Sequence, residues 1–507
     1  MKNRSKRLLG GAITSVICAG ALATALPANG AVRNLFIAAT DGFHYVPTHI
    51  GGPPDVTGDG STPAVPEFID TASYRKVYMR GFCDDTPAQT ATPGCANMPA
   101  PIIDVNKGDD VFIVLRNIDN ANPISPKDPH TIHLHGQQVT TQNDGFNETS
   151  FEVPEASACL DDTGASIPGC SNTAIYYWYA DKAGTFMWHC HVEASEHISM
   201  GMYGALIVRP TDRDGNASTD TVYSARGGSF MDRFDKEYVW MLSDVDSVSR
   251  DAIQSDFNPA ALAGTPADPV ATGEDPQDII DYNFADYQAD WWLINGRAFP
   301  DTILGTYDPA ACNSDPARTV DMAIDFEGCN PPASGPPSGF LTGSNNLASY
   351  APLVAGQWGD KVLVRTINMG YQDQSFHFHG WHFKTVGKDA NPIPVDQQRE
   401  QYTLQIGSGE AHDVIINMSK LDNHANNGFG PNFVGFSFIT GQGGSLNEFA
   451  CIWGVYSDAS GDCNSPLGTG NFNVDVQWYP AHSHYDYQVT NNGGYPGGMA
   501  GLMLVTP

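Results

Sequence analysis

A short stretch of the chain brings together side chains that bind soft transition metals. His189-Cys190-His191 places a thiol between two imidazoles, and His197 and Met202 follow a few residues later. Cysteine thiolate, histidine nitrogen and a weak methionine sulfur are the ligands of a blue copper electron-transfer site. Because successive side chains of an extended strand point to opposite faces, Cys190 faces away from its two histidine neighbours. The stretch therefore predicts one copper site on one side and two histidines for a second metal site on the other.

Histidine pairs with one intervening residue recur along the chain. The 15 histidines include four such pairs, His133/His135, His189/His191, His377/His379 and His482/His484. In a strand, each pair directs both imidazoles to one face. A single pair is also compatible with a surface feature, but four pairs at matching points of a repeated sequence predict a cluster of metal ions. Ligation by imidazole alone suits copper.

The two halves of the sequence resemble each other around these pairs. Thr131–Gly136 matches Ser375–Gly380 in residue class, and Gly201–Gly204 matches Gly498–Gly501. Such self-similarity, at a period much longer than a solenoid repeat, indicates the duplication of one structural unit.

Short alternating apolar runs, separated by turns rich in Gly and Asp, predict strands along the whole chain. We therefore predict an all-β protein with two sandwich domains, at residues 32–212 and 228–507. Two stretches rich in Pro, Gly and Asp, about 250–285 and 308–350, are expected to be long loops inserted in the second domain.

The first half of the sequence holds a complete mononuclear ligand set. It consists of His130, Cys190, His197 and Met202. Met200 is a rival for the methionine position, but Met202 is favoured because it aligns with a methionine of the second half.

The second half lacks this set. Gln374 stands at the position of the first histidine and Ser483 at that of the cysteine, and no histidine precedes Met499 in its loop. Met499 is either a relic of a lost site or a core residue, and core packing is the simpler interpretation.

The net charge bears on the possible binding partners, and the N-terminal residues bear on the cellular location of the protein. The net charge of −31 predicts a surface that repels nucleic acid and anionic membranes and attracts cations, although solubility alone is the simpler explanation of this charge. Residues 1–28 combine a basic start with an apolar run and predict a secretory signal peptide. The sequence has no other apolar run long enough to span a membrane. We expect a secreted or periplasmic protein.

Cysteine usage agrees with an oxidising compartment. Beyond Cys18 and Cys190, the cysteines fall in close sequence pairs, Cys83/Cys95, Cys159/Cys170, Cys312/Cys329 and Cys451/Cys463. We predict local disulfides within these pairs. Zinc binding is the alternative, but the sequence contains no Cys-x-x-Cys motif.

These motifs resemble those of the multicopper oxidases, which include laccases and metal oxidases. The resemblance rests on His130–Gly136, Trp188–His191, His377–Gly380 and His482–His484. It implies two cupredoxin-like Greek-key β-sandwich domains. Because the cysteine motif lies in the first repeat and only two repeats occur, the order differs from that of three-domain laccases. It is similar to that of two-domain multicopper oxidases and copper nitrite reductases.

The resemblance also implies about four copper ions per chain. The mononuclear set would hold the type 1 (blue) copper, and His133 and His377 the type 2 copper. One type 3 copper would be held by His135, His189 and His484, and the other by His191, His379 and His482. The implied reaction is one-electron oxidation of a small donor coupled to the reduction of O2 to water.

Several roles are less sharply indicated. Asp144 resembles an acidic residue near the laccase copper cluster, where it would orient water or deliver protons, although an Asp-Gly turn is an equal alternative. Glu193 and Glu196 are further acid candidates. Phenols, aromatic amines and Mn(II), Cu(I) or Fe(II) ions are all open as donors, and the acidic composition slightly favours the metal ions. Asp128 and Glu196 are candidates for binding such an ion. In two-domain relatives the copper cluster lies between chains, which implies a homotrimer here. A cluster within one chain is the alternative, because the linker between the two domains is long enough to allow it.

Two alternative functions remain open. Copper-dependent nitrite reduction needs only three histidines at its type 2 site, so one histidine pair would be dispensable. A non-catalytic copper carrier would favour methionine-rich ligand runs, which do not occur among the 13 methionines.

Overall fold

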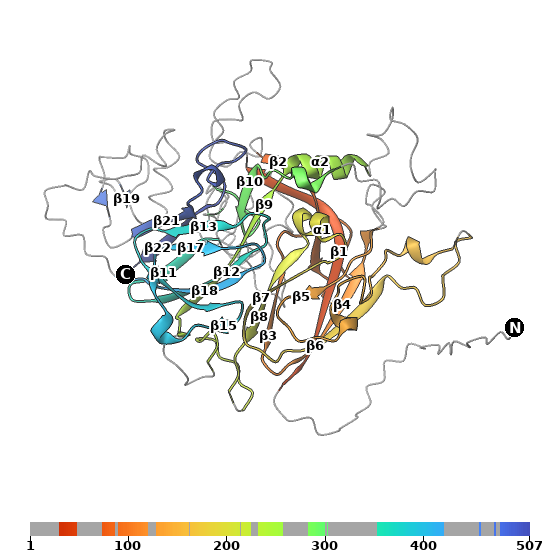
Figure 1. The fold of residues 1–507 in the computed structure, drawn as a ribbon, viewed down its shortest axis with the longest axis horizontal. Coiled ribbons are helices and arrows are strands. Elements are labelled where there is room, and N and C mark those ends of the chain that lie inside the picture. The colour runs from red at the N-terminus through yellow and green to blue at the C-terminus, as the bar shows by residue number, and fades with distance from the viewer. Residues whose placement is uncertain are drawn as a thin grey trace, which may run out of the picture.

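The structure of the protein is a computed structural model. The structure describes residues 30–47, 74–86, 90–119, 128–161, 163–212, 214–224, 232–256, 282–299, 302, 352–419, 456–457, 471–472 and 477–506. Strands dominate these residues, and the two α-helices among them are α1 (Ala194–Met200) and α2 (Ser247–Asp256). Figure 1 shows two groups of strands side by side, coloured red to yellow and green to blue. We call residues 30–212 the first half and residues 232–506 the second half.

The first half is a sandwich of two four-stranded sheets. One sheet has the order β2-β1-β4-β6, formed by Tyr74–Asp84, Val32–Pro47, Asp110–Asn117 and Thr173–Tyr179. The other has the order β3-β8-β7-β5, formed by Ala100–Asn106, Tyr203–Arg209, Gly184–His189 and His133–Leu134. Buried and partly exposed residues alternate along β4, because one face of the sheet packs on the core.

The second half is also a sandwich. Its larger sheet has the order β10-β9-β12-β18-β14-β15, formed by Trp291–Ile294, Lys236–Val245, Lys361–Asn368, Ala411–Asn417, Phe383–Lys388 and Asn391–Pro392. β16 (Glu400–Gln401) also pairs with β14. Its smaller sheet has the order β11-β22-β21-β13-β17, formed by Val354–Gln357, Ala500–Thr506, Gln477–Ser483, Gln374–Phe378 and Thr403–Ile406. A separate pair joins β19 (Tyr456–Ser457) to β20 (Asn471–Phe472).

The same pairing scheme occurs in both halves. Each sandwich contains two parallel strand pairs, β1/β4 and β3/β8 in the first half, and β9/β12 and β11/β22 in the second. In each half a hydrophobic core fills the space between the two sheets. The all-β class with sandwich architecture predicted from the sequence is confirmed.

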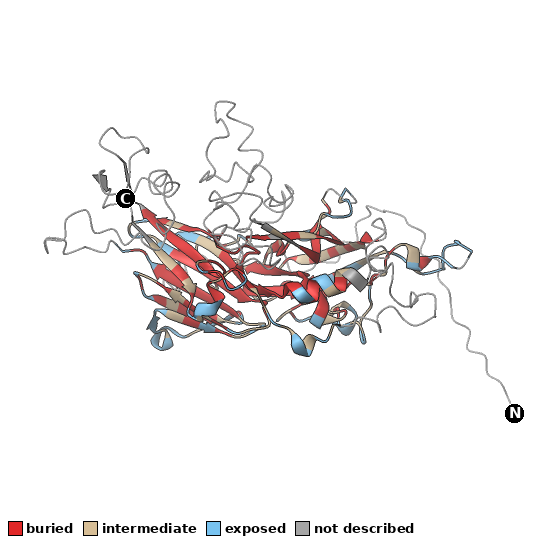
Figure 2. Cartoon of the chain, turned by 90° about the horizontal axis from the view of Figure 1, so that it is seen from above, coloured by how far each residue is buried: buried red, intermediate tan, exposed pale blue. Residues whose placement is uncertain are grey.

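The two halves pack against each other through a shared apolar cluster. Met187 and Tyr203 of the first half lie in one cluster with Met241 and Leu293 of the second. Figure 2 shows buried residues continuing across both groups of strands. A polar link accompanies the cluster, because Arg365 Nη1 donates to the hydroxyl of Thr185 at 2.6 Å.

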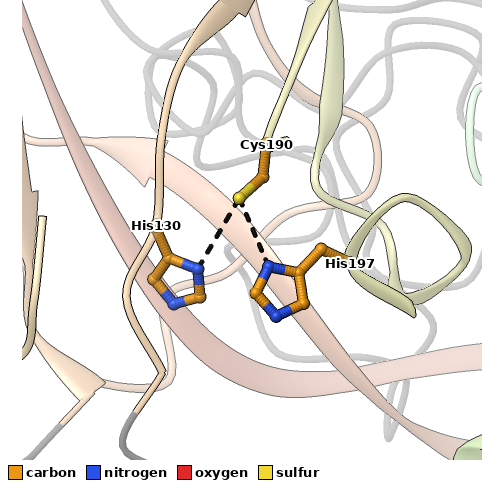
Figure 3. Close-up of side chains that lie close together, drawn as sticks. All are labelled: His130, Cys190 and His197. Carbon is orange, nitrogen blue, oxygen red and sulfur yellow. Dashed lines mark hydrogen bonds between the residues drawn. The ribbon is translucent and has the colours of Figure 1, made fainter. Parts of the chain in front are cut away.

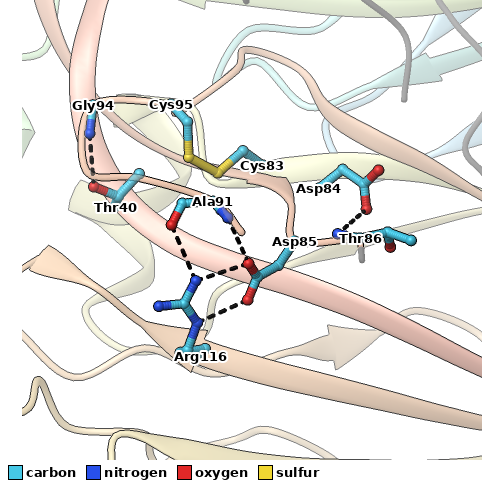
Figure 4. The surroundings of a disulfide bond; sticks show 9 residues. All are labelled: Thr40, Cys83, Asp84, Asp85, Thr86, Ala91, Gly94, Cys95 and Arg116. Carbon is cyan, nitrogen blue, oxygen red and sulfur yellow. Dashed lines mark hydrogen bonds and ion pairs between the residues drawn. A yellow bond between two sulfur atoms is a disulfide. The ribbon is translucent and has the colours of Figure 1, made fainter. Parts of the chain in front are cut away.

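Two of the predicted disulfides are present. Cys83 is bonded to Cys95, and Cys159 is bonded to Cys170, whereas Cys190 is free. Figure 4 shows the first bond beside a short ion pair that joins Arg116 to Asp85 at 2.8 Å. Local pairing is therefore confirmed for these two pairs.

Other predictions lie outside the described residues. These are the signal peptide at 1–28, the loop at 308–350, and the pairs Cys312/Cys329 and Cys451/Cys463. Among the described residues, no helix has the length and apolar character needed to cross a membrane.

The prediction of a loop at 250–285 is wrong for its first residues, because these belong to α2, which continues to Asp256. Asp246 begins this helix by accepting a hydrogen bond from the Val248 amide at 2.9 Å. Arg250 and Ile253 are buried on the inner side of α2, so the helix is held by packing that local composition does not reveal. Residues 257–281 lie outside the described part of the chain.

Candidate metal centre

Three predicted ligands converge in the interior of the first half. Figure 3 shows His130, Cys190 and His197 arranged around the cysteine sulfur. The Sγ of Cys190 lies 3.2 Å from Nδ1 of His197 and 3.9 Å from Nδ1 of His130. All three side chains are fully buried. A thiol and two imidazole nitrogens directed at one point are a donor set for copper.

The electrostatics of this trio also suit a cation. Although burial opposes it, His197 and His130 lower the pKa of the Cys190 thiol well below its ordinary value. Burial likewise opposes protonation of His197, but Cys190 and Asp128 raise the pKa of that imidazole to about 10. The trio therefore favours a thiolate next to a positive charge, and a bound copper ion would supply that charge in place of the proton.

Backbone hydrogen bonds position the ligands. Cys190 follows the last residue of β7, and its amide donates to the carbonyl of Met202 at 3.0 Å. His197 lies on α1, which is entered through Glu193 in a left-handed conformation with φ of 39°. The Met202 amide donates to the carbonyl of His197 at 3.0 Å, so the cysteine, the helix and the methionine form one tightly connected unit.

The structure distinguishes the two methionines considered for this site. Met202 is fully buried in the same hydrophobic cluster as Cys190. Met200 packs in a different cluster with Tyr78 and Ile253. Met202 therefore remains our candidate.

Asp119 is a partner that sequence reasoning missed. Its Oδ2 lies 2.6 Å from Nε2 of His130, on the side of the ring remote from Cys190. Asp119 is buried, and despite burial of the ring its charge raises the pKa of His130. A carboxylate on the outer nitrogen of a ligand histidine fixes the tautomer and orients the ring.

A buried arginine occupies the outer side of His197. Nη1 of Arg80 lies 2.6 Å from Nε2 of His197 and 2.9 Å from Oε1 of Glu196, and it also forms an ion pair with Asp128. The Arg80 side chain is 1% exposed. Against the effect of burial, Arg80 lowers the pKa of Asp128. The two acids proposed to bind a metal-ion donor therefore already share a cation.

The first half gathers its four remaining predicted histidines into one group. The ring centre of His133 lies 5.1 Å from that of His135 and 5.2 Å from those of His189 and His191. Nε2 of His135 lies 2.9 Å from Nε2 of His189. The register that pairs His133 with His189 across β5 and β7 produces this group. We call these residues the first histidine group.

The second half forms a matching group from His377, His379, His482 and His484. Ring centres lie 4.7 Å apart for His377 and His379, and 5.5 Å apart for His377 and His484. Nε2 of His379 lies 3.0 Å from Nε2 of His482. In the pairing of β13 with β21, His377 of β13 lies opposite His482 of β21. We call these residues the second histidine group.

In both groups, backbone carbonyls hold the Nδ1 atoms. The carbonyl of Cys190 accepts from His189 at 2.6 Å, and that of Ser483 accepts from His482 at 2.9 Å. Tyr402, another missed residue, accepts from His377 at 2.7 Å.

Burial and neighbouring histidines lower the pKa of His135 and of His379 to about 4. Neutral imidazoles that turn their free Nε2 atoms toward one another fit metal ions. Among the described residues, which include all eight histidines, neither a ring contact nor a hydrogen bond joins the two groups within the chain.

The two acid candidates have different surroundings. The carbonyl of Asp144 accepts a hydrogen bond from Nδ1 of His133 at 2.6 Å, and its Oδ2 lies 3.6 Å from the same nitrogen. Gly145 adopts φ of 76°, and a Cβ there would overlap the carbonyl of Ile132. Asp144 thus lies at the first histidine group and also in a turn. Glu196 lies on the side of the buried trio, in an ion pair with Arg80, which also contacts His197.

Comparison with known proteins agrees with this geometry. Residues 72–212 match the family model described as multicopper oxidase. A laccase of Aspergillus fumigatus is 24% identical over 385 residues, which cover 69% of this chain and 55% of the laccase. A copper-containing nitrite reductase of Pseudomonas chlororaphis is 26% identical over 212 residues, covering 41% of this chain and 48% of that protein. The chain thus spans about half the length of these two relatives.

Among solved structures, a blue copper oxidase from Nitrosomonas europaea aligns with a TM-score of 0.48 at 19% identity, covering 94% of this chain and 86% of the other. The part of the chain that contains Cys190, residues 72–212, thus matches the multicopper oxidase family.

Proposed function

We propose that the protein is a multicopper oxidase that couples one-electron oxidation of a small donor to the reduction of O2 to water. The observation that carries this proposal is the covalent continuity of Cys190 with His189 and His191. The thiol belongs to the buried trio, whereas its two neighbours belong to the first histidine group. Copper bound to these residues would supply electron transfer and oxygen chemistry.

The proposed ligand roles follow the groups. His130, Cys190, His197 and Met202, which are all fully buried, would hold type 1 copper. Type 2 copper would use His133 and His377. The type 3 pair would use His135, His189 and His484 for one ion, and His191, His379 and His482 for the other. Within this arrangement Asp144 would orient His133 through its carbonyl, and its carboxylate, 3.6 Å from the same ring nitrogen, would orient water or deliver protons at the cluster.

Removal of one ligand tests these roles against a matched neighbour. His377→Ala should lower copper per chain and abolish O2 uptake, whereas His382→Ala should leave both unchanged. His382 is an exposed histidine close to the second group, and it is not part of that group. Equal copper content in the two variants would contradict the ligand assignment.

We further propose that the copper cluster is completed between chains in a homotrimer. The cluster needs both histidine groups, and among the described residues no ring contact or hydrogen bond joins them within one chain. His133, His191 and His377 are partly exposed and His484 is exposed, so each group is open to a partner. The first group of one chain would meet the second group of the next.

Complementation between two inactive chains tests this arrangement. One chain carries His133→Ala with His135→Ala, and the other carries His377→Ala with His379→Ala. In a cyclic trimer that contains both chains, about one in three clusters would combine two intact groups. Co-expression should therefore restore O2 uptake in a trimer detected by native mass spectrometry. A cluster confined to one chain would remain inactive in the mixture.

The donor class is proposed from the blue-site side. Arg80 forms ion pairs with both Asp128 and Glu196. A metal ion that acts as electron donor would therefore have to compete with Arg80 for these two carboxylates. We therefore place phenols and aromatic amines ahead of Mn(II), Cu(I) and Fe(II) as donors. Glu196→Gln should change kcat/KM for a phenol and for Mn(II) by the same factor. A selective loss with Mn(II) would instead support a metal-ion donor.

Nitrite reduction is the second candidate, because copper nitrite reductases are among the relatives. The presence of the complete second histidine group favours oxygen reduction, since nitrite reduction would leave part of it without a role. O2 uptake and nitrite consumption, measured with the same donor, separate the two reactions.

Export is also a proposal. It is supported by the character of residues 1–28 and by the two disulfides Cys83–Cys95 and Cys159–Cys170. Mass spectrometry of the mature chain tests it, because loss of about the first 28 residues is expected.

A further inference from the structure

The second half contains a buried, largely polar cluster at the position that the proposed blue site occupies in the first half. It consists of Gln374, Ser483, Gln488 and Met499, which are all fully buried. We propose that this cluster is the intact framework of a second mononuclear copper site, in which neutral side chains have replaced the ligands. The inference uses the proposed copper role of Cys190 as its template, and it goes beyond the proposed function.

The cysteine position is matched by a backbone hydrogen bond. In the first half, the Cys190 amide donates to the carbonyl of Met202 at 3.0 Å. In the second half, the Ser483 amide donates to the carbonyl of Met499 at 3.0 Å. Ser483 follows His482 as Cys190 follows His189. The serine therefore replaces the thiol by a hydroxyl on the same framework.

A second hydrogen bond identifies the position of the missing histidine. The Met202 amide donates to the carbonyl of His197 at 3.0 Å, and the Met499 amide donates to that of Gln488 at 2.8 Å. Sequence spacing alone hides this match, because Gln488 follows its serine more closely than His197 follows its cysteine. Gln488 thus stands where the first half has a ligand imidazole.

The side chains around the ligands correspond as well. Nδ2 of Asn117 donates to the carbonyl of Asp128 at 2.7 Å, and Nδ2 of Asn368 donates to that of Gln372 at 2.8 Å. Gln372 is therefore the counterpart of Asp128. Its Oε1 accepts from Nε2 of Gln488 at 3.0 Å, in the way that Asp128 faces the ligand histidine of the first half.

The second half has no carboxylate at the position that corresponds to Asp119, the partner of His130. The amide of Asp119 donates to Oδ1 of Asn117 at 3.1 Å, and the amide of Gly370 donates to Oδ1 of Asn368 at 3.1 Å. Gly370 is thus the counterpart of Asp119 and has no carboxylate. The two acids that face the histidines of the trio, Asp119 and Asp128, thus have the uncharged counterparts Gly370 and Gln372.

Two of the replacing side chains, Ser483 and Gln488, form a hydrogen bond with each other. Oγ of Ser483 donates to Oε1 of Gln488 at 2.5 Å. Gln374, the counterpart of His130, has a buried Oε1 without a hydrogen-bond partner among the described residues. Hydroxyl and amide oxygens are poor substitutes for thiolate and imidazole as copper ligands. The cluster therefore keeps the backbone hydrogen bonds and the methionine of the first half, but it lacks the side chains that would bind copper tightly.

Restoring the ligands tests the proposal. The test chain carries Gln374→His, Ser483→Cys and Gln488→His in a Cys190→Ser background, which removes the original thiolate. The matched control carries Gln374→His, Ser483→Cys and Thr490→His, with one histidine placed two residues away in the same loop. Both chains are loaded with Cu(II), and the visible thiolate-to-copper band, the electron paramagnetic resonance spectrum and copper per chain are measured.

We expect the band to be absent from the Cys190→Ser chain, to return in the test chain with an intensity per chain close to that of the native protein, and to remain absent from the control. A folded test chain without the band, or an equal band in the control, would overturn the inference. If the triple change prevents folding, Ser483→Cys with Gln488→His is measured instead, with the amide oxygen of Gln374 as a weak ligand. A folded double variant without the band also overturns the inference. Absence of the band from the copper-loaded native chain would instead refute the proposed function.

Discussion

Arg80 is the buried cation on which the surroundings of the proposed blue site depend. Its side chain is 1% exposed, and it pairs with Asp128 and Glu196, whose side chains are 9% and 2% exposed. Arg80→Met keeps an apolar stem but leaves two buried carboxylates without their cation. Removing one partner of a buried ion pair costs about 3–5 kcal/mol.

This cost can be converted to a melting temperature. With an unfolding entropy of about 2.1 cal/mol/K per residue, cooperative unfolding of the whole chain gives a decrease of about 3–5 °C. If the first half unfolds alone, the decrease is roughly two to three times larger. Thermal unfolding of the copper-free protein, followed by circular dichroism, measures it without any contribution from metal binding.

The effect should also depend on pH. Arg80 lowers the pKa of Asp128 from its ordinary value of 3.8 in the folded chain. The pair therefore stabilises the native protein fully above about pH 4, and this contribution is lost as the pH falls further. The difference between native and variant melting temperatures should shrink below about pH 4.

A matched control separates burial from charge. Arg233 forms an ion pair of 2.6 Å with Asp220, but these side chains are 49% and 35% exposed. Arg233→Met should cost only about 0–1 kcal/mol. The reasoning is refuted if Arg80→Met lowers the melting temperature no more than Arg233→Met does.

Three further predictions concern other parts of the molecule. Burial raises the pKa of Asp290 to about 6, so its contribution to the stability of the native protein should decrease as the pH rises from about 4 to 7. Asp290→Asn should therefore be more stable than the native protein by about 1–2 kcal/mol at pH 7 in thermal unfolding. If the variant shows the same dependence of stability on pH as the native protein, this prediction is wrong. Asp119→Asn removes a negative charge beside His130 and should raise the reduction potential of the copper-loaded blue site in a redox titration, whereas an unchanged potential would show that the carboxylate has no electrostatic role. Replacing Cys83 and Cys95 by serine opens a loop of sequence separation 12 and should lower the free energy of unfolding by about 3 kcal/mol in guanidinium titrations, and a change below about 1 kcal/mol would contradict the expected constraint.

Local spacing was enough to predict much of the site. The alternation of side chains along an extended strand correctly separated Cys190 from His189 and His191, because that alternation is a property of the backbone. The pairing of His133 with His189 then follows from two neighbouring strands. The strand pattern and the two local disulfides were predicted for the same reason, since each depends on residues close in sequence.

Residues that act through distant packing could not be predicted in this way. Arg80 comes from β2 and reaches His197 across a separation of 117 residues. Asp119 reaches His130 from a neighbouring loop, and nothing in its own sequence surroundings marks it as a partner. Gln488 was missed as a counterpart of His197 because the two loops differ in length, and only the backbone hydrogen bonds reveal the match. In each case tertiary contacts, rather than spacing, define the role.

Copper content is the most direct test of the central claim. The chain is reconstituted with Cu(II), freed of loosely bound metal, and analysed for copper and protein in the same sample. Our account predicts about four copper ions per chain, one at the blue site and three shared between the two histidine groups. About two per chain would match a nitrite reductase, and about one would leave only an electron carrier. Either of these lower values would contradict the oxidase assignment.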